Sequence, residues 1–102
     1  MSVKKIEESD FEEVIKNDTK KVLVDCYADW CGPCQMLGPV IESLSEEIDN
    51  VEFYKLNIDN AMEVASKYQI MSIPTLLIFE NGSLKEKLIG FQTADELREK
   101  LK

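Results

Sequence analysis

The sequence predicts an α/β protein built on a central mixed β-sheet with helices on both faces. Segments with strand and helix patterns alternate along most of the chain, and parallel strand pairs require such helical crossovers. The segment 21–28 is apolar at almost every position, which is typical of a strand buried on both faces of a sheet. Asn81-Gly82 is a strong hairpin signal, so the two strands that flank it are antiparallel.

The first elements are a strand, a helix and a second strand. A short strand is expected at 3–6. Ser9 and Glu12 have the spacing of a capping box, which predicts a helix from there to about Lys16. The buried strand 21–28 follows and marks the centre of the sheet.

The Cys31-Gly32-Pro33-Cys34 turn follows this strand, and a second helix is expected after it. Pro39 should kink this helix near its first turns, because proline cannot donate the main-chain hydrogen bond. The apolar residues expected to form its buried stripe are Met36, Leu37, Val40, Ile41, Leu44 and Ile48.

The second half of the chain continues the alternation and then forms a hairpin. A strand is expected at 51–58, and Asn60 with Glu63 predicts a short helix to about Tyr68. Strands at 75–80 and 83–89 flank the Asn81-Gly82 turn. The last helix is amphipathic through Leu97 and Leu101, and its predicted capping box is Thr93 with Glu96.

Length and composition indicate one domain, residues 1–102, with a core of its own. Of the 102 residues 44% are hydrophobic, and three cysteines are an odd number for a secreted disulfide scaffold. Residues 1–10 contain no apolar export segment, so we expect a cytoplasmic protein. The longest apolar run, 73–79, is interrupted by Pro74 and Thr75 and is shorter than the roughly 20 residues that cross a bilayer. No membrane partner is expected.

The charge and the missing histidine exclude several function classes. A formal net charge of -8 repels phosphate backbones, so nucleic-acid binding is not expected. Histidine is absent, which excludes Cys-His and Ser-His-Asp catalysis and histidine-ligated metal sites. The remaining chemistry must use Cys, Asp, Glu, Lys and Tyr.

Cys31 and Cys34 lie three residues apart where a buried strand ends and a helix begins. This spacing allows a disulfide, and the positive end of the helix dipole favours the thiolate of Cys31. Cys31 is therefore the expected nucleophile. Cys34, one turn further in and less exposed, is expected to resolve a mixed disulfide. A zinc site using Cys26 and a carboxylate, or a purely structural disulfide, are weaker alternatives because ligands are few and a four-residue loop removes little entropy.

The segment Trp30-Cys31-Gly32-Pro33-Cys34, with Ile73-Pro74-Thr75, Asn81-Gly82 and Gly90, resembles the thioredoxin family over essentially the whole chain. The resemblance implies the thioredoxin fold and protein-disulfide reductase activity. It also implies a thioredoxin reductase as electron source and disulfide-containing proteins as targets. No bound cofactor or metal is expected beyond the redox-active Cys31–Cys34 disulfide, and we expect a monomer.

Asp25 and Lys55 are further candidate catalytic residues. An acid within an apolar strand needs an explanation, and burial would raise its pKa. The resemblance assigns Asp25 the proton of Cys34, so Asp25→Ala should slow target reduction more than it alters the fold. It makes Lys55 the neighbour of Asp25, although a lysine that reaches the surface explains Lys55 equally well. Cys26, on the opposite face of the strand from Asp25, is interpreted as a buried core residue.

The resemblance also implies a target-docking surface. A cis Pro74 would leave the backbone of Ile73 free to pair with an extended substrate peptide. The other expected contributors are Trp30, Gly32, Pro33 and Gly90.

Departures from the family pattern affect the expected potential and target preference. They are Cys26, Tyr27, Gln35 and Met71-Ser72. Two other functions remain open: a disulfide oxidant or isomerase with a more stabilised thiolate, and a non-catalytic binding subunit that uses the same apolar surface.

Overall fold

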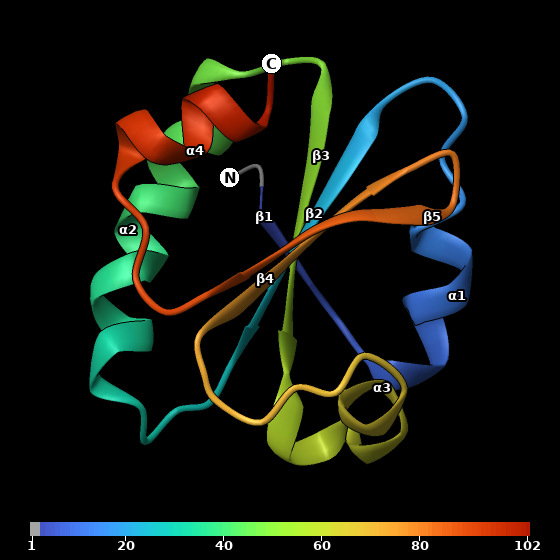
Figure 1. The fold of residues 1–102 in the computed structure, drawn as a ribbon, viewed down its shortest axis with the longest axis vertical. Helices are drawn as coiled ribbons and strands as arrows, with labels where there is room; N and C mark the ends of the chain where they lie inside the picture. Colours follow the sequence, from blue (N-terminus) through green and yellow to red (C-terminus); the bar gives the residue numbers. More distant parts are fainter. Residues whose placement is uncertain (1–2) are drawn as a thin grey trace.

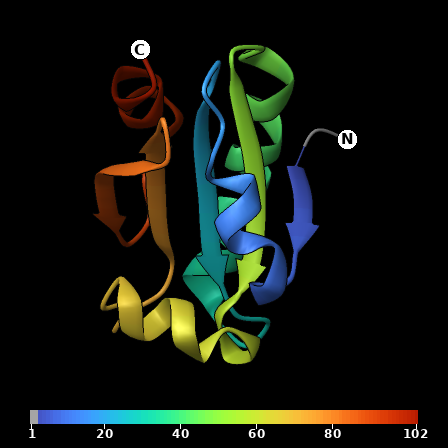
Figure 2. The same cartoon turned by 90° about the vertical axis from the view of Figure 1, so that its right-hand side faces the viewer.

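The computed structural model describes residues 3–102 and confirms the predicted mixed sheet (Figure 1). Its five strands have the order β1-β3-β2-β4-β5, which Figure 2 shows face-on from the side of the first helix. The strands are β1 (Val3–Ile6), β2 (Lys21–Tyr27), β3 (Val51–Asn57), β4 (Thr75–Glu80) and β5 (Ser83–Ile89), and the helices are α1 (Phe11–Val14), α2 (Gly32–Glu47), α3 (Met62–Lys67) and α4 (Ala94–Lys100). β1 and β2 are parallel to β3, whereas β4 is antiparallel to β2 and β5.

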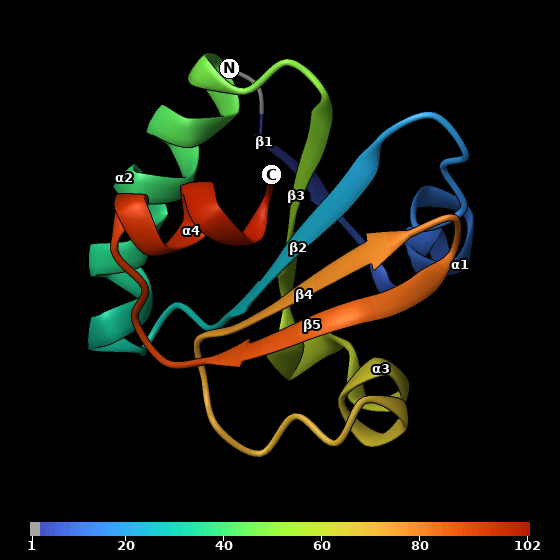
Figure 3. The ribbon, with the colours of Figure 1, turned by 45° about the horizontal axis from the view of Figure 1, so that its top comes forward.

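The helices cover both faces of the sheet in pairs. α2 and α4 pack on one face through Leu37, Ile41 and Leu97, and Figure 3 shows α4 beside α2. α1 and α3 pack on the other face through Phe11 and Val64. Each face therefore has its own apolar core, and the central strands contribute to both.

The central strand β2 directs alternate side chains into the two cores, as a strand must. Leu23 lies in the core beneath α2 and α4. Val22, Val24 and Cys26 lie in the core beneath α1 and α3. Asp25 consequently faces α2, and Cys26 lies on the opposite face as predicted.

Two predicted helix caps are wrong. The first helix is preceded by a 3-10 turn in which the Glu7 N–H donates to Asp10 Oδ2 at 3.0 Å, so Ser9 does not cap it. Asn57 caps a second 3-10 turn by accepting from the Asp59 N–H at 2.9 Å, and the buried Ala61 precedes α3. In both places a 3-10 turn, absent from the expected pattern, moves the helix start along the chain.

The buried stripe of α2 is narrower than predicted. Leu37, Ile41 and Leu44 are fully buried, but Met36 is 65% exposed. Met36 is one residue, about 100° of helix rotation, away from the stripe centred on Leu37, which places it on the flank of the helix. α2 includes Pro39 within its span.

The hairpin and the last helix agree with the prediction. Asn81 and Gly82 both have positive φ, 54° and 81°, as a type I′ turn requires. In α4 the Thr93 hydroxyl accepts from the Glu96 N–H, and the Glu96 carboxylate accepts from the Thr93 N–H at 2.8 Å. Within residues 3–102 no helix is both long and apolar enough to cross a membrane.

Candidate active site

The cysteine pair lies at the N-terminus of α2, as predicted. Cys31 is the N-cap residue, Pro33 occupies the first turn, and Cys31 and Cys34 form a disulfide with their Cα atoms 5.2 Å apart. The Cys34 N–H points at Cys31 Sγ, with the nitrogen 3.2 Å from the sulfur. An N–H donor and the helix dipole both stabilise negative charge on Cys31 once the disulfide is reduced.

The two sulfur-bearing residues are about equally buried in this oxidised state. Cys31 is 4% exposed and Cys34 6%, so the expectation that Cys34 is the less exposed of the two is not met. Both pack with Ala28 and Ile73 in a small cluster at the end of β2. Sequence spacing alone does not reveal that both cysteines belong to this cluster.

The segment before β4 lies against Cys31. The Ile73–Pro74 peptide bond is cis, and the Ile73 carbonyl oxygen is 3.7 Å from Cys31 Sγ. The Pro74 carbonyl accepts a hydrogen bond from the Gly90 N–H at 2.8 Å. Gly90 has a φ of 90°, which favours glycine. Ile73, Pro74 and Gly90, far apart in sequence from the cysteines, are thus brought to one end of the sheet with them.

Large apolar side chains are exposed near this site. Trp30 is 72% exposed, and its Nε1–H donates to Asp59 Oδ2 at 2.8 Å. A side chain at Gly32 would meet open space. Asp59 was not among the predicted site residues, because an acidic residue in a turn carries no sequence signal for this contact. The exposure of Met62 and Met71, 72% and 93%, was also not predicted.

Asp25 is a strongly perturbed acid near the cysteines. It is 5% exposed and pairs in register with Lys55 on the neighbouring strand β3. Desolvation raises its pKa to about 7, and the positive charge of Lys55 limits the rise. A cleft of about 190 Å³ is lined by Asp25, Lys55 and Cys34 together. The predicted burial of Asp25 and its neighbourhood with Lys55 are confirmed.

Cys26 is separate from this group of residues. It is fully buried on the opposite face of β2, and desolvation, with a smaller effect of the Asp25 charge, raises the pKa of its thiol to about 12. Among residues 3–102 no cluster of three or more His, Cys, Asp or Glu residues is arranged to hold a metal ion.

Gln35, one of the departures from the family pattern, directly follows Cys34. Its Nε2 donates to the Asp29 carbonyl at 3.0 Å, across the start of α2. The side chain therefore ties the loop before Cys31 to the helix but adds no positive charge near the sulfur.

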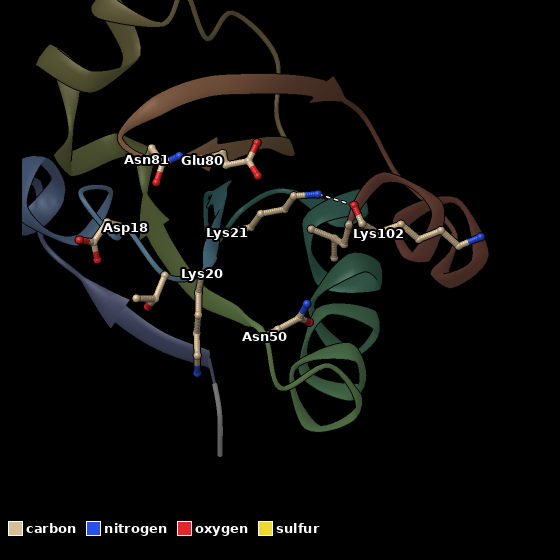
Figure 4. A pocket seen from close by; sticks show the side chains of 9 residues that line it. Asp18, Lys20, Lys21, Asn50, Glu80, Asn81 and Lys102 are labelled. Atoms are coloured by element: carbon tan, nitrogen blue, oxygen red, sulfur yellow. Dashed lines mark hydrogen bonds between the residues drawn. The ribbon is translucent and has the colours of Figure 1, made fainter.

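A second hollow lies at the other end of the sheet, where β2 and β3 begin and β4 ends (Figure 4). Its two central lysines already have partners: Lys20 pairs with Glu52 at 3.1 Å, and the Lys21 Nζ donates to the Lys102 carbonyl. Its lining contains both signs of charge, with the acids Asp18 and Glu80 beside Lys20, Lys21 and Lys102. It carries no chemistry comparable to that of the cysteine pair.

A redox-active cysteine pair at a helix N-terminus, next to a buried acid, defines a dithiol/disulfide oxidoreductase. The chain belongs to the thioredoxin family, whose model, described as Thioredoxin, matches residues 2–102. It is 42% identical over 102 residues to a thioredoxin of Staphylococcus epidermidis, covering 99% of this chain and 96% of that protein. It is 47% identical over 83 residues to a thioredoxin of Mycoplasmoides gallisepticum, covering 81% and 83% of the two chains.

Solved structures give the same result. A mutant thioredoxin from Halobacterium salinarum superimposes with a TM-score of 0.90 at 35% identity, over 98% of this chain and 88% of that chain. The predicted thioredoxin fold is therefore confirmed. The protein is a protein-disulfide oxidoreductase that carries out thiol–disulfide exchange through Cys31 and Cys34.

Proposed function

We propose that the protein is a general protein-disulfide reductase of the cytoplasm that receives electrons from a thioredoxin reductase. It acts as a monomer formed from a single domain, residues 1–102, with no bound cofactor. The observation that carries the proposal is that Asp25 and Cys34 line the same cleft. Beside them, at the N-terminus of α2, the Cys34 N–H points at the sulfur of Cys31. This arrangement supplies a stabilised thiolate at Cys31 and a proton acceptor for Cys34.

The reaction has two exchange steps. The Cys31 thiolate attacks one sulfur of a target disulfide, forms a mixed disulfide and releases the other target sulfur as a thiolate. Asp25 then takes the proton of Cys34, and the Cys34 thiolate attacks Cys31 Sγ. The second target thiolate leaves, and the protein is left with the Cys31–Cys34 disulfide. Two electrons have passed to the target.

Two groups of residues assist these steps. Lys55 balances the negative charge that Asp25 carries before it accepts the proton, because the two residues pair across β2 and β3. The target peptide lies over Trp30, Gly32 and Pro33 and extends along Ile73, Pro74 and Gly90. The exposed indole of Trp30 and the short distance from Ile73 to Cys31 Sγ support this docking surface.

A redox titration and a trapping experiment test the proposal. The midpoint of the Cys31–Cys34 couple is measured in thiol/disulfide buffers by the fluorescence of Trp30, the only tryptophan. A reducing midpoint, together with a target mixed disulfide that accumulates in Cys34→Ser but not in Cys31→Ser, is the expected result. An oxidising midpoint would indicate a disulfide oxidant or isomerase. Unchanged partner binding and biological activity in the double serine variant would indicate a binding subunit.

A further inference from the structure

A larger cleft adjoins Asp25 on the side away from the cysteines. It has a volume of about 570 Å³ and lies between α2 and the first strands of the sheet. Its charged lining residues are Asp25 from β2, Lys55 from β3, and Glu42 and Glu46 from α2. The contribution of β1 is the apolar Val3. Asp25 therefore lines two clefts: the smaller one holds Cys34, and the larger one holds two glutamates.

Two carboxylate oxygens in this cleft are buried without a hydrogen-bond partner among the described residues. They are Asp25 Oδ1 and Glu42 Oε1. Leaving a buried acceptor without a hydrogen bond destabilises the fold, and the cost is greater when the group is charged. α2 has exposed positions available for acids, since Glu46 and Glu47 on the same helix are exposed. The burial of the Glu42 oxygen is therefore a local cost that helix formation does not require.

Water is the natural partner for both oxygens. The cleft is many times larger than the roughly 30 Å³ that one water molecule occupies in the liquid, and its lining offers several polar groups. The cleft has room for a short chain of water molecules between the carboxyl group of Asp25 and the carboxylate of Glu42, which both line it. Glu42 itself is half-buried, so its other oxygen can exchange protons with bulk water.

We propose that Glu42 is the proton outlet of Asp25: it receives, through water in the larger cleft, the proton that Asp25 takes from Cys34, and it releases that proton to solvent. This role rests on the proposed function, in which Asp25 is the acceptor for Cys34. The proton moves from Cys34 Sγ to the Asp25 carboxylate, then through water to the Glu42 carboxylate, and then to bulk. No electrons move in these transfers, and Asp25 is left ionised for the next cycle.

The three charged residues Asp25, Lys55 and Glu42 have different roles in this proton path. Burial raises the pKa of Asp25 to about 7, close to neutral pH, so Asp25 can both take up a proton and give it up, and a nearby acceptor provides the route for its release. Lys55, in register with Asp25, offers positive charge to the same water but cannot accept a proton while it is charged. Glu42 is the acceptor in the cleft whose carboxylate combines a buried and a solvent-accessible side.

The test compares Glu42→Gln with the matched control Glu46→Gln, a change of the same kind on the same helix and in the same cleft. The rate at which Cys34 resolves a mixed disulfide is followed by Trp30 fluorescence across the neutral pH range. We expect Glu42→Gln to slow resolution severalfold and to move its pH profile, while Glu46→Gln remains close to wild type. The rate of Cys31 attack, measured in the Cys34→Ser background, should be unchanged by either substitution.

Two further measurements separate a relay from a structural role. A small buffer base such as imidazole, which can enter the cleft and accept the proton of Asp25, should restore the rate of Glu42→Gln in a concentration-dependent way and leave wild type unaffected. Glu42→Asp, which keeps a carboxylate in the cleft, should retain more of the rate than Glu42→Gln. A structural defect would respond to neither the buffer nor the shorter acid.

Asp25→Asn distinguishes failure of the relay from failure of the proposed function. If Asp25→Asn slows resolution but Glu42→Gln behaves like Glu46→Gln, the relay is wrong and the role of Asp25 stands. If Asp25→Asn leaves resolution unchanged, the role of Asp25 in the proposed function is wrong and the relay is overturned with it.

Discussion

At the scale of single residues, one acid, Asp25, is held in a place where an ionised acid is costly. Asp25 is almost fully buried on the core-facing side of the central strand, and one of its carboxyl oxygens has no hydrogen-bond partner among the described residues. Its pairing in register with Lys55 offsets part of the desolvation cost. The protonated form is consequently favoured in the folded protein relative to the unfolded chain.

This cost makes stability depend on pH in a direction that can be measured. The pKa of Asp25 is raised from 3.8 to about 7, so the folded state binds its proton more tightly than the unfolded state. Stability from this group is present below about pH 4 and is lost as pH rises through about 7, a loss of up to about 4 kcal/mol. Asp25→Asn should remove this dependence. The difference in free energy of unfolding, Asp25→Asn minus wild type, should grow between about pH 4 and pH 8.5 when both proteins are unfolded by urea at each pH. A difference that is constant with pH would contradict the assignment.

Cys26 gives a second prediction for a single residue. It is fully buried, and burial raises the pKa of its thiol to about 12, so little thiolate exists at neutral pH and a reagent reaches the sulfur only when the fold opens locally. In the reduced native protein a bulky maleimide should label Cys31 readily and Cys26 at least about a hundredfold more slowly. Mass spectrometry of the labelled peptides checks this. Equal labelling of all three cysteines in the native protein, without denaturation, would show that Cys26 is accessible.

At the scale of elements, each helix is held by different means. α2 is anchored by a buried stripe and by the disulfide at its first turn. α4 is only seven residues long, too short to be stable alone, and relies on Leu97 and on a complete capping box. Arg98 of α4 also pairs with Glu47 of α2 at 2.7 Å, an exposed contact of small energetic value.

The capping box of α4 can be tested by one substitution. Thr93→Ala removes the hydroxyl that accepts from the Glu96 N–H and leaves that donor unsatisfied. We expect the free energy of unfolding to fall by about 1 kcal/mol. Thr93→Ser keeps the acceptor and should be nearly neutral. Thermal unfolding followed by circular dichroism measures both variants, and equal destabilisation by serine and alanine would argue against the cap.

At the scale of the whole molecule, the two cores share the same central strands. Leu23 and Leu76 belong to the core under α2 and α4, whereas Val24 and Leu77, their neighbours in the same strands, belong to the core under α1 and α3. Loss of packing on one face therefore weakens the strands on which the other face depends. Such coupling favours cooperative unfolding of the entire sheet.

A cavity in one core tests this coupling. Leu37 is fully buried in α2, and Leu37→Ala should lower the free energy of unfolding by about 2–5 kcal/mol. The transition should remain a single one when it is followed by Trp30 fluorescence near α2 and by amide exchange in β1 and α1. Met36→Ala, one residue away and exposed, should change the free energy of unfolding little. Separate transitions for the two faces would show that the cores unfold independently.

Much of this molecule follows from local pattern. The strand positions, the hairpin at Asn81-Gly82, the capping box of Thr93 and the helix after Cys31 were predicted because each depends on neighbouring residues or on simple periodicity. The predicted starts of α1 and α3 are wrong for the same reason, because they too were inferred from neighbouring residues alone. Several residues there, such as Ser9 and Asn60, have cap-forming side chains, and only the 3-10 turns of the folded chain select Glu7 and Asn57 instead.

The sequence by itself determined the fold class, the family and the two cysteines, since alternation of elements and a short contiguous motif are local properties. Only the tertiary structure decided which residues from distant parts of the chain lie around the two cysteines and Asp25. The contact of Ile73 with Cys31, the bond from Trp30 to Asp59 and the shared cleft of Asp25 with Glu42 join separate elements across the sheet. Such contacts depend on strand order, register and helix rotation, which arise from packing the whole chain into two cores, and no local pattern encodes them.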